Sequence, residues 1–87
     1  MTTATATKIR RNADGQQNLI ELRKALAASP HMVYSQGGDW IVSIWSDVAG
    51  AFLTHPMGPW AGERQAIQKA LGLEIESKDH AAMFARR

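Results

Sequence analysis

The sequence predicts an α+β domain in the order helix, three-stranded antiparallel meander, helix, with residues 1–13 as a flexible tail and residues 14–87 as one domain. Three observations support this class. Apolar residues recur at helical spacing in two segments, the stretch between them alternates with a period of two, and a Gly-Gly pair marks its first reversal. Of the 87 residues, 45% are hydrophobic, which suits one small core.

The first helix is predicted to begin at Asp14 and to end at Ala28. The Asp14 side chain can cap the first turn, and Gln17 stands three residues later, which is the spacing of a capping box. Ser29 and Pro30 should stop the helix. Its core-facing stripe comprises Leu19, Leu22 and Leu26.

A β-hairpin is predicted next. Met32–Gln36 and Trp40–Trp45 flank Gly37 and Gly38, and a tight two-residue turn accepts this pair because glycine tolerates positive φ. Side chains alternate between the faces of a strand, so each face has its own set. One face carries Val33, Trp40, Val42 and Ile44, and the other carries Met32, Tyr34, Ile41, Ser43 and Trp45.

A third strand is predicted within Val48–Thr54. Gly50 leaves open whether the turn before this strand has two residues or is a longer loop over Asp47–Gly50. The register of this strand therefore stays undetermined, and so does the face on which each of its side chains lies.

The second helix is predicted to start at Pro59, which suits a first helical position, and to end at a left-handed Gly72. Its apolar stripe comprises Trp60, Ile67, Ala70 and Leu71. Ser77 is predicted to cap a short C-terminal helix that runs through Phe84. At the other end, the polar, Thr-rich segment favours a tail over an edge strand across Thr5, Thr7 and Ile9.

No motif in the sequence points to catalysis. The histidines, His31, His55 and His80, are too far apart to suggest a ligand pair, and the chain has no cysteine. The glycines match neither a dinucleotide fingerprint nor a phosphate loop. We therefore expect no catalytic, cofactor-binding or metal-binding residues, and no enzyme activity. The apolar stretches are too short to span a membrane, and the absence of cysteine fits a cytoplasmic protein.

Aromatic side chains on the second sheet face indicate a binding surface. If both helices cover the face with Val42, then Tyr34, Ile41 and Trp45 remain on the open side. A macromolecular partner, self-association as a homodimer, or the tail folded over this face would each explain them. We favour a protein partner because Tyr and Trp are enriched in protein interfaces.

A nucleic-acid interface is the alternative. Basic residues gather at the two ends of the chain, namely Lys8, Arg10, Arg11, Arg86 and Arg87. They can contact phosphates, but the net charge is only +2 and terminal basic residues are usually solvated.

The order of elements over residues 17–73 resembles that of the double-stranded RNA-binding domain. That family opens its second helix with lysines, which implies phosphate contacts there. The corresponding segment of this chain, Trp60-Ala61-Gly62-Glu63-Arg64-Gln65, has one cation and one acid, and this composition argues against RNA recognition.

Two segments are similar to those of small phage-encoded accessory proteins of helix-sheet-helix form. These are Trp40-Ile41-Val42 and Ala66-Ile67-Gln68-Lys69-Ala70-Leu71-Gly72. The resemblance implies an inhibitor of a host defence complex, as the anti-CRISPR proteins of this size class are. Our hypothesis is a non-enzymatic module that binds a larger protein or ribonucleoprotein complex.

Overall fold

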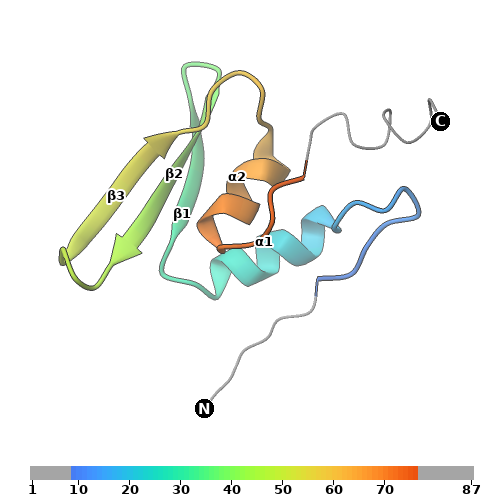
Figure 1. Ribbon diagram of the computed structural model, residues 1–87, viewed down its shortest axis with the longest axis horizontal. Coiled ribbons are helices and arrows are strands. Elements are labelled where there is room, and N and C mark those ends of the chain that lie inside the picture. Colours follow the sequence, from blue (N-terminus) through green and yellow to red (C-terminus); the bar gives the residue numbers. More distant parts are fainter. Residues whose placement is uncertain (1–8, 77–87) are drawn as a thin grey trace, which may run out of the picture.

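Two helices and three strands make up the computed structural model, which describes residues 9–76 (Figure 1). They follow in the order α1 (Leu19–Ala27), β1 (Met32–Gln36), β2 (Asp39–Ser46), β3 (Ala51–Pro56) and α2 (Glu63–Ala70). The strands form one antiparallel sheet with the order β1-β2-β3. The predicted α+β class is confirmed. The helix predicted from Ser77 lies outside the described residues.

Helix α1 begins about one turn later than predicted. Its cap is Asn18, whose side-chain oxygen accepts the backbone N–H of Glu21 at 3.0 Å. The Asp14 carboxylate instead accepts the N–H of Gln16 at 3.0 Å, and so closes a local turn. Both residues have side chains suited to capping, and the second one along the chain starts the helix.

The segment before α1 is folded back on itself. Arg11 and Gln17 form an antiparallel bridge, and backbone hydrogen bonds join Asn12 to Gln16 and Asn18 to Arg10. Hydrogen-bonded structure therefore extends to Arg10, whereas the sequence placed the boundary of the domain at Asp14.

Helix α2 also begins about one turn later than predicted, because Gly62 rather than the residue before Pro59 precedes its first turn. The backbone N–H of Gly62 donates to the Gln65 side chain at 2.9 Å. Trp60 thus lies before the helix and is exposed, so its assignment to the apolar stripe was wrong.

The end of α2 is as predicted. Gly72 has a φ of 72°, the left-handed region that glycine tolerates. Its N–H donates to the carbonyl of Lys69 at 3.2 Å, and the N–H of Leu73 donates to the carbonyl of Gln68 at 2.9 Å. This is the Schellman arrangement, which satisfies carbonyls that would otherwise lack partners.

The sheet register confirms the predicted division of faces. Val33 is opposite Val42, and Tyr34 is opposite Ile41. The turn before β3 is the longer of the two alternatives, a loop over residues 47–50 in which Gly50 has a φ of 65°.

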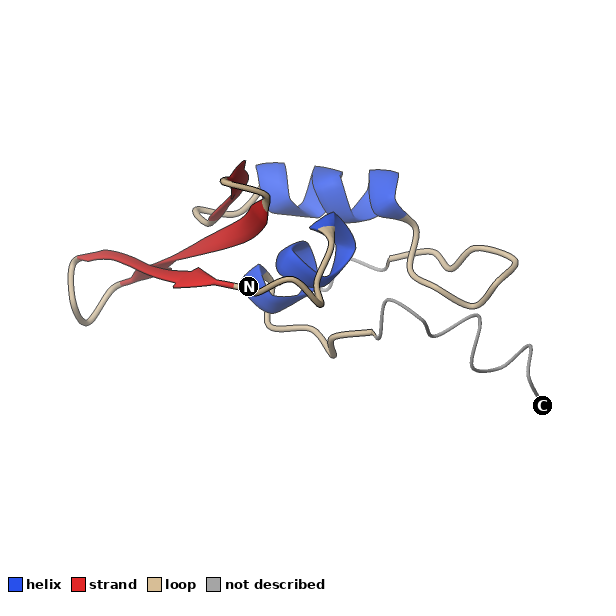
Figure 2. Cartoon of the chain, turned by 90° about the horizontal axis from the view of Figure 1, so that it is seen from above, coloured by secondary structure: helices blue, strands red, loops and turns tan. Residues whose placement is uncertain are grey.

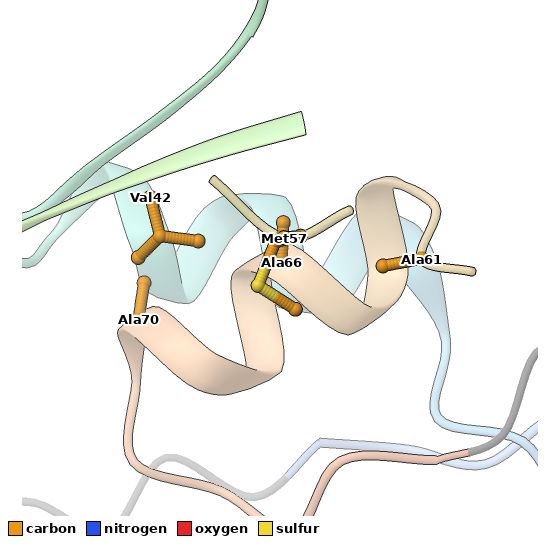
Figure 3. Close-up of a cluster of buried hydrophobic side chains, with 5 residues drawn as sticks. All are labelled: Val42, Met57, Ala61, Ala66 and Ala70. Atoms are coloured by element: carbon orange, nitrogen blue, oxygen red, sulfur yellow. The ribbon is translucent and has the colours of Figure 1, made fainter. Parts of the chain in front are cut away.

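The helices form a second layer that covers only part of one sheet face. Helix α2 packs on β1 and β2, and α1 packs on α2. A core cluster lies between α2 and the sheet, and Figure 3 shows its residues Val42, Met57, Ala61, Ala66 and Ala70. Ala66 and Ala70 are the residues of this cluster that α2 contributes. All six β3 residues are exposed, and the loop that joins β2 to β3 lies well away from the helices (Figure 2).

Candidate protein-binding face

The sheet face opposite the helices, here called the open face, is the candidate site. Strand alternation and the observed register define its members. They are Met32, Tyr34 and Gln36 from β1, Asp39, Ile41, Ser43 and Trp45 from β2, and Phe52, Thr54 and Pro56 from β3. Asp39, next to the Gly37-Gly38 turn, is the only charged residue in this set.

The three residues predicted for the site lie on this face but differ in exposure. Tyr34 is 39% exposed and Trp45 is half-buried, whereas Ile41 is only 9% exposed. Ile41 lies on the central strand, between Tyr34 and Pro56 of the neighbouring strands, so side chains flank it on both sides. It therefore forms the floor of the face, and Tyr34 and Trp45 form part of its rim.

Phe52 is the main residue that sequence reasoning missed. It is 41% exposed and lies opposite Trp45 in the sheet register. The alternation of side chains along β3 was the only feature of the sequence that could have identified it. That alternation assigns Phe52 to a face only when the length of the preceding loop is known. Met32, which the sequence placed on this face without a role, is also exposed, on β1.

Interactions within the chain hold Trp45 in one orientation. Its ring Nε1 donates to the Asp47 carboxylate at 2.8 Å, and its ring meets Phe52 edge-to-face with centroids 5.1 Å apart. Its backbone N–H donates to Nδ1 of His31, the residue just before β1, at 3.0 Å. A fixed aromatic ring loses little conformational entropy on binding, which is the property of a good anchor.

Polar groups at the centre of the face satisfy one another. The hydroxyls of Ser43 and Thr54 are hydrogen-bonded at 2.8 Å across β2 and β3, and Ser43 is buried. The face therefore offers exposed apolar and aromatic groups around a neutral centre, without an unpaired charge there. Such a surface can bury against another protein at a low desolvation cost.

Of the basic residues predicted for nucleic-acid contacts, the structure describes Arg10 and Arg11; Arg11 is hydrogen-bonded within the chain, whereas the Arg10 side chain is 82% exposed. Nη1 of Arg11 is 2.6 Å from Oε2 of Glu76 and also donates to the carbonyl of Gly15, and Arg10 is 3.8 Å from Glu21. Lys8, Arg86 and Arg87 lie outside the described residues.

The start of α2 is occupied by intramolecular contacts as well. Glu63 accepts two hydrogen bonds from the Arg23 guanidinium, at 2.9 and 2.7 Å, and Nε of Arg64 donates to the carbonyl of Gln17 at 3.0 Å. The double-stranded RNA-binding domain meets phosphates with free lysines at this place, and this chain has a paired carboxylate instead.

A polar cluster joins the segment before α1 to the segment after α2. The Glu76 carboxylate accepts hydrogen bonds from the Gln17 backbone, the Gln68 side chain and Arg11. Burial by itself raises the pKa of Glu76, but the hydrogen bonds from Gln68, Gln17 and Arg11 and the charge of Arg11 together outweigh it, so the pKa lies below its usual 4.5.

This lowered pKa predicts acid sensitivity. Because the pKa is lower in the folded chain, the ionised carboxylate contributes its full stability above about pH 4.5 and loses it as the pH falls through the folded value. We expect Glu76→Gln to flatten the fall in unfolding free energy between about pH 6 and about pH 3, measured by urea denaturation. Glu74→Gln, at an exposed position nearby, is the matched control, and an unchanged slope for Glu76→Gln would contradict the assignment.

Neither helix in the described part of the chain is long and apolar enough to cross a bilayer. Among residues 9–76, no group of three or more His, Asp or Glu side chains is placed to hold a metal ion.

Comparison of the chain with known proteins found no matching protein family, no matching curated protein and no matching solved structure.

Proposed function

We propose that this chain is a non-enzymatic protein-binding module that holds a larger protein against its open face. The observation that carries the proposal is an exposed, nearly uncharged aromatic surface on which Trp45 is fixed by Asp47 and Phe52. Large apolar patches on a small domain commonly mark interaction sites, and rigid Trp and Tyr side chains dominate the energy of such contacts.

The distribution of charge supports a protein over a nucleic acid. The open face has no basic residue, and its one charged group, Asp39, is acidic. Phosphate recognition needs lysine and arginine side chains that are free to replace counterions. Arg11 is instead paired with Glu76 at 2.6 Å, which leaves Arg10 as the one largely exposed arginine of the two.

The class of partner rests on the sequence resemblance alone. Similarity to small phage-encoded inhibitors suggests that the partner belongs to a cytoplasmic host defence complex, of protein or ribonucleoprotein composition. An inhibitor of this kind needs no catalytic group, because it acts by occupying a surface.

Capture experiments with paired baits test the proposal. A host protein should be retained by the wild-type chain and lost with the double variant Tyr34→Ser and Phe52→Ser. Ile20→Ser is the control, because it removes an apolar side chain that is 60% exposed on α1, outside the open face. Retention should change little between about 0.1 M and about 0.5 M salt, since apolar contacts are only weakly screened.

Two results would contradict the proposal. A partner that the double variant retains does not bind the open face. A partner whose retention collapses over the same range of salt, and which nuclease treatment releases, is a nucleic acid held by the basic ends of the chain.

A further inference from the structure

In the part of the chain that the structure describes, β3 is an edge strand without the usual protection against pairing. All six of its side chains are exposed, and none of them is Lys, Arg, Asp or Glu. Natural edge strands usually carry charges, bulges or a covering helix, because their free backbone groups invite another strand. A proline also protects an edge, and β3 has one, Pro56, but only at its last position.

The register identifies the backbone groups that β3 presents to the outside. The N–H of Met57 donates to the carbonyl of Trp40 at 2.8 Å, in line with the register of β2 and β3. Hydrogen-bonded pairs alternate along an antiparallel ladder, so Leu53 and His55 direct their backbone groups toward β2. Phe52 and Thr54 direct theirs outward, and Pro56 offers only its carbonyl.

Leu53 is an apolar side chain that the described residues, 9–76, leave uncovered. It lies on the same sheet face as the helices, opposite Ile44, yet it is 46% exposed because the helices pack over β1 and β2. An apolar contact is therefore missing at the middle of this edge.

We propose that two copies of this chain pair antiparallel through β3, about a two-fold axis that passes Leu53. In this register Phe52 of each copy pairs with Thr54 of the other, and every outward donor and acceptor of these two residues has a partner. Leu53 meets its symmetry mate on the helix side. The two sheets become one continuous sheet, with both open faces on the same side.

In this proposal the edge that pairs is β3 rather than β1, and the strand that pairs with it belongs to a second copy of the chain rather than to another protein. Pairing through β1 would bring the two helix layers together, because α2 packs over β1 and β2. A strand is complementary to itself when it pairs antiparallel about a two-fold axis, and this register leaves no outward N–H of β3 unpaired. The contact is short, so we expect weak association that depends on the concentration of the chain.

Disulfide trapping tests the register, because the chain has no cysteine of its own. The Cα atoms of the two Leu53 residues would lie roughly 4.5 Å apart, within the range that a disulfide spans. Leu53→Cys should therefore form a covalent dimer under mild oxidation. His55→Cys is the control on the same face, since its symmetry mates would lie roughly 13 Å apart and should not cross-link. Equal cross-linking of both variants would overturn the register.

Charge complementation tests the dimer itself. By sedimentation equilibrium up to about 1 mM, the wild-type mass should rise from 9.5 kDa toward twice that value. Leu53→Lys and Leu53→Glu should each stay at the mass of one chain, and an equimolar mixture of the two should dimerise again because opposite charges meet on the axis.

Ile20→Lys, which adds the same charge on α1, should behave as the wild type. A wild-type mass that stays at 9.5 kDa would overturn the proposal, and so would a Leu53→Lys variant that still dimerises, because the contact would then lie elsewhere. The inference does not depend on partner binding, since it uses the backbone of β3 and the Leu53 side chain on the helix side, whereas the partner is proposed to contact side chains of the open face.

Discussion

Replacing Gln68 with methionine should lower the free energy of unfolding by about 3–4 kcal/mol, although the two side chains are similar in size and shape. Gln68 is fully buried on α2. Its Nε2 donates to Oε1 of Gln17 at 3.0 Å and to Oε1 of Glu76 at 2.9 Å, and its Oε1 accepts the backbone N–H of Glu76 at 2.9 Å. Methionine can make none of these bonds, so several buried groups lose a partner together.

A second glutamine on the same helix provides the control. Gln65 is also buried, but its Nε2 has no hydrogen-bond partner, and its Oε1 accepts only the N–H of Gly62. Gln65→Met removes an unsatisfied donor as well as one capping bond, so its effect should stay within about 1 kcal/mol. Urea denaturation of both variants measures the difference. Equal losses would show that the cluster around Glu76 contributes no special stability.

Trp45→Ala should weaken partner binding at least ~30-fold, which corresponds to about 2 kcal/mol, the level of an interface hot spot. The same change should cost only about 1–2 kcal/mol of stability, because Trp45 is half-buried and its loss removes the edge-to-face contact with Phe52 and one exposed hydrogen bond to Asp47. Isothermal titration with the captured protein and denaturation of the free chain separate the two effects.

Val48→Ala is the matched control for Trp45→Ala. Val48 is fully exposed in the loop between β2 and β3, outside the open face, and its truncation should leave affinity unchanged. If Trp45→Ala preserves affinity while it destabilises the fold, Trp45 is a structural residue and the anchor assignment is wrong.

The parts of the fold that depend on local chemistry were predictable. Gly37 and Gly38 tolerate the positive φ of a tight turn, and the alternation on either side of them assigns Tyr34 and Ile41 to one face. Gly72 was predictable for the same reason. The helix starts were harder, because Asp14 and Asn18 both have side chains suited to capping, and in the structure Asp14 closes a local turn while Asn18 caps α1.

The parts that depend on contacts between distant segments could not be predicted from the sequence. Phe52 could be assigned to the open face only when the length of the loop before β3 was known. The low exposure of Ile41 depends on the neighbouring strand, where Pro56 lies beside it. The hydrogen bonds between Gln68 and Glu76 cross the end of α2, and those with Gln17 cross most of the chain. Glutamine on a helix ordinarily indicates a solvent-facing position.

Oxidative footprinting of the chain, free and in complex with its captured partner, tests most directly whether the open face is the contact surface. In the free chain Met32, Tyr34 and Phe52 should be modified, since each is exposed. Trp60 serves as the internal reference, because it is exposed in the segment between β3 and α2 and is not a member of the open face. In the complex the open-face residues should be protected while Trp60 reacts as before. Protection of Trp60 with unchanged modification of Tyr34 and Phe52 would contradict the account.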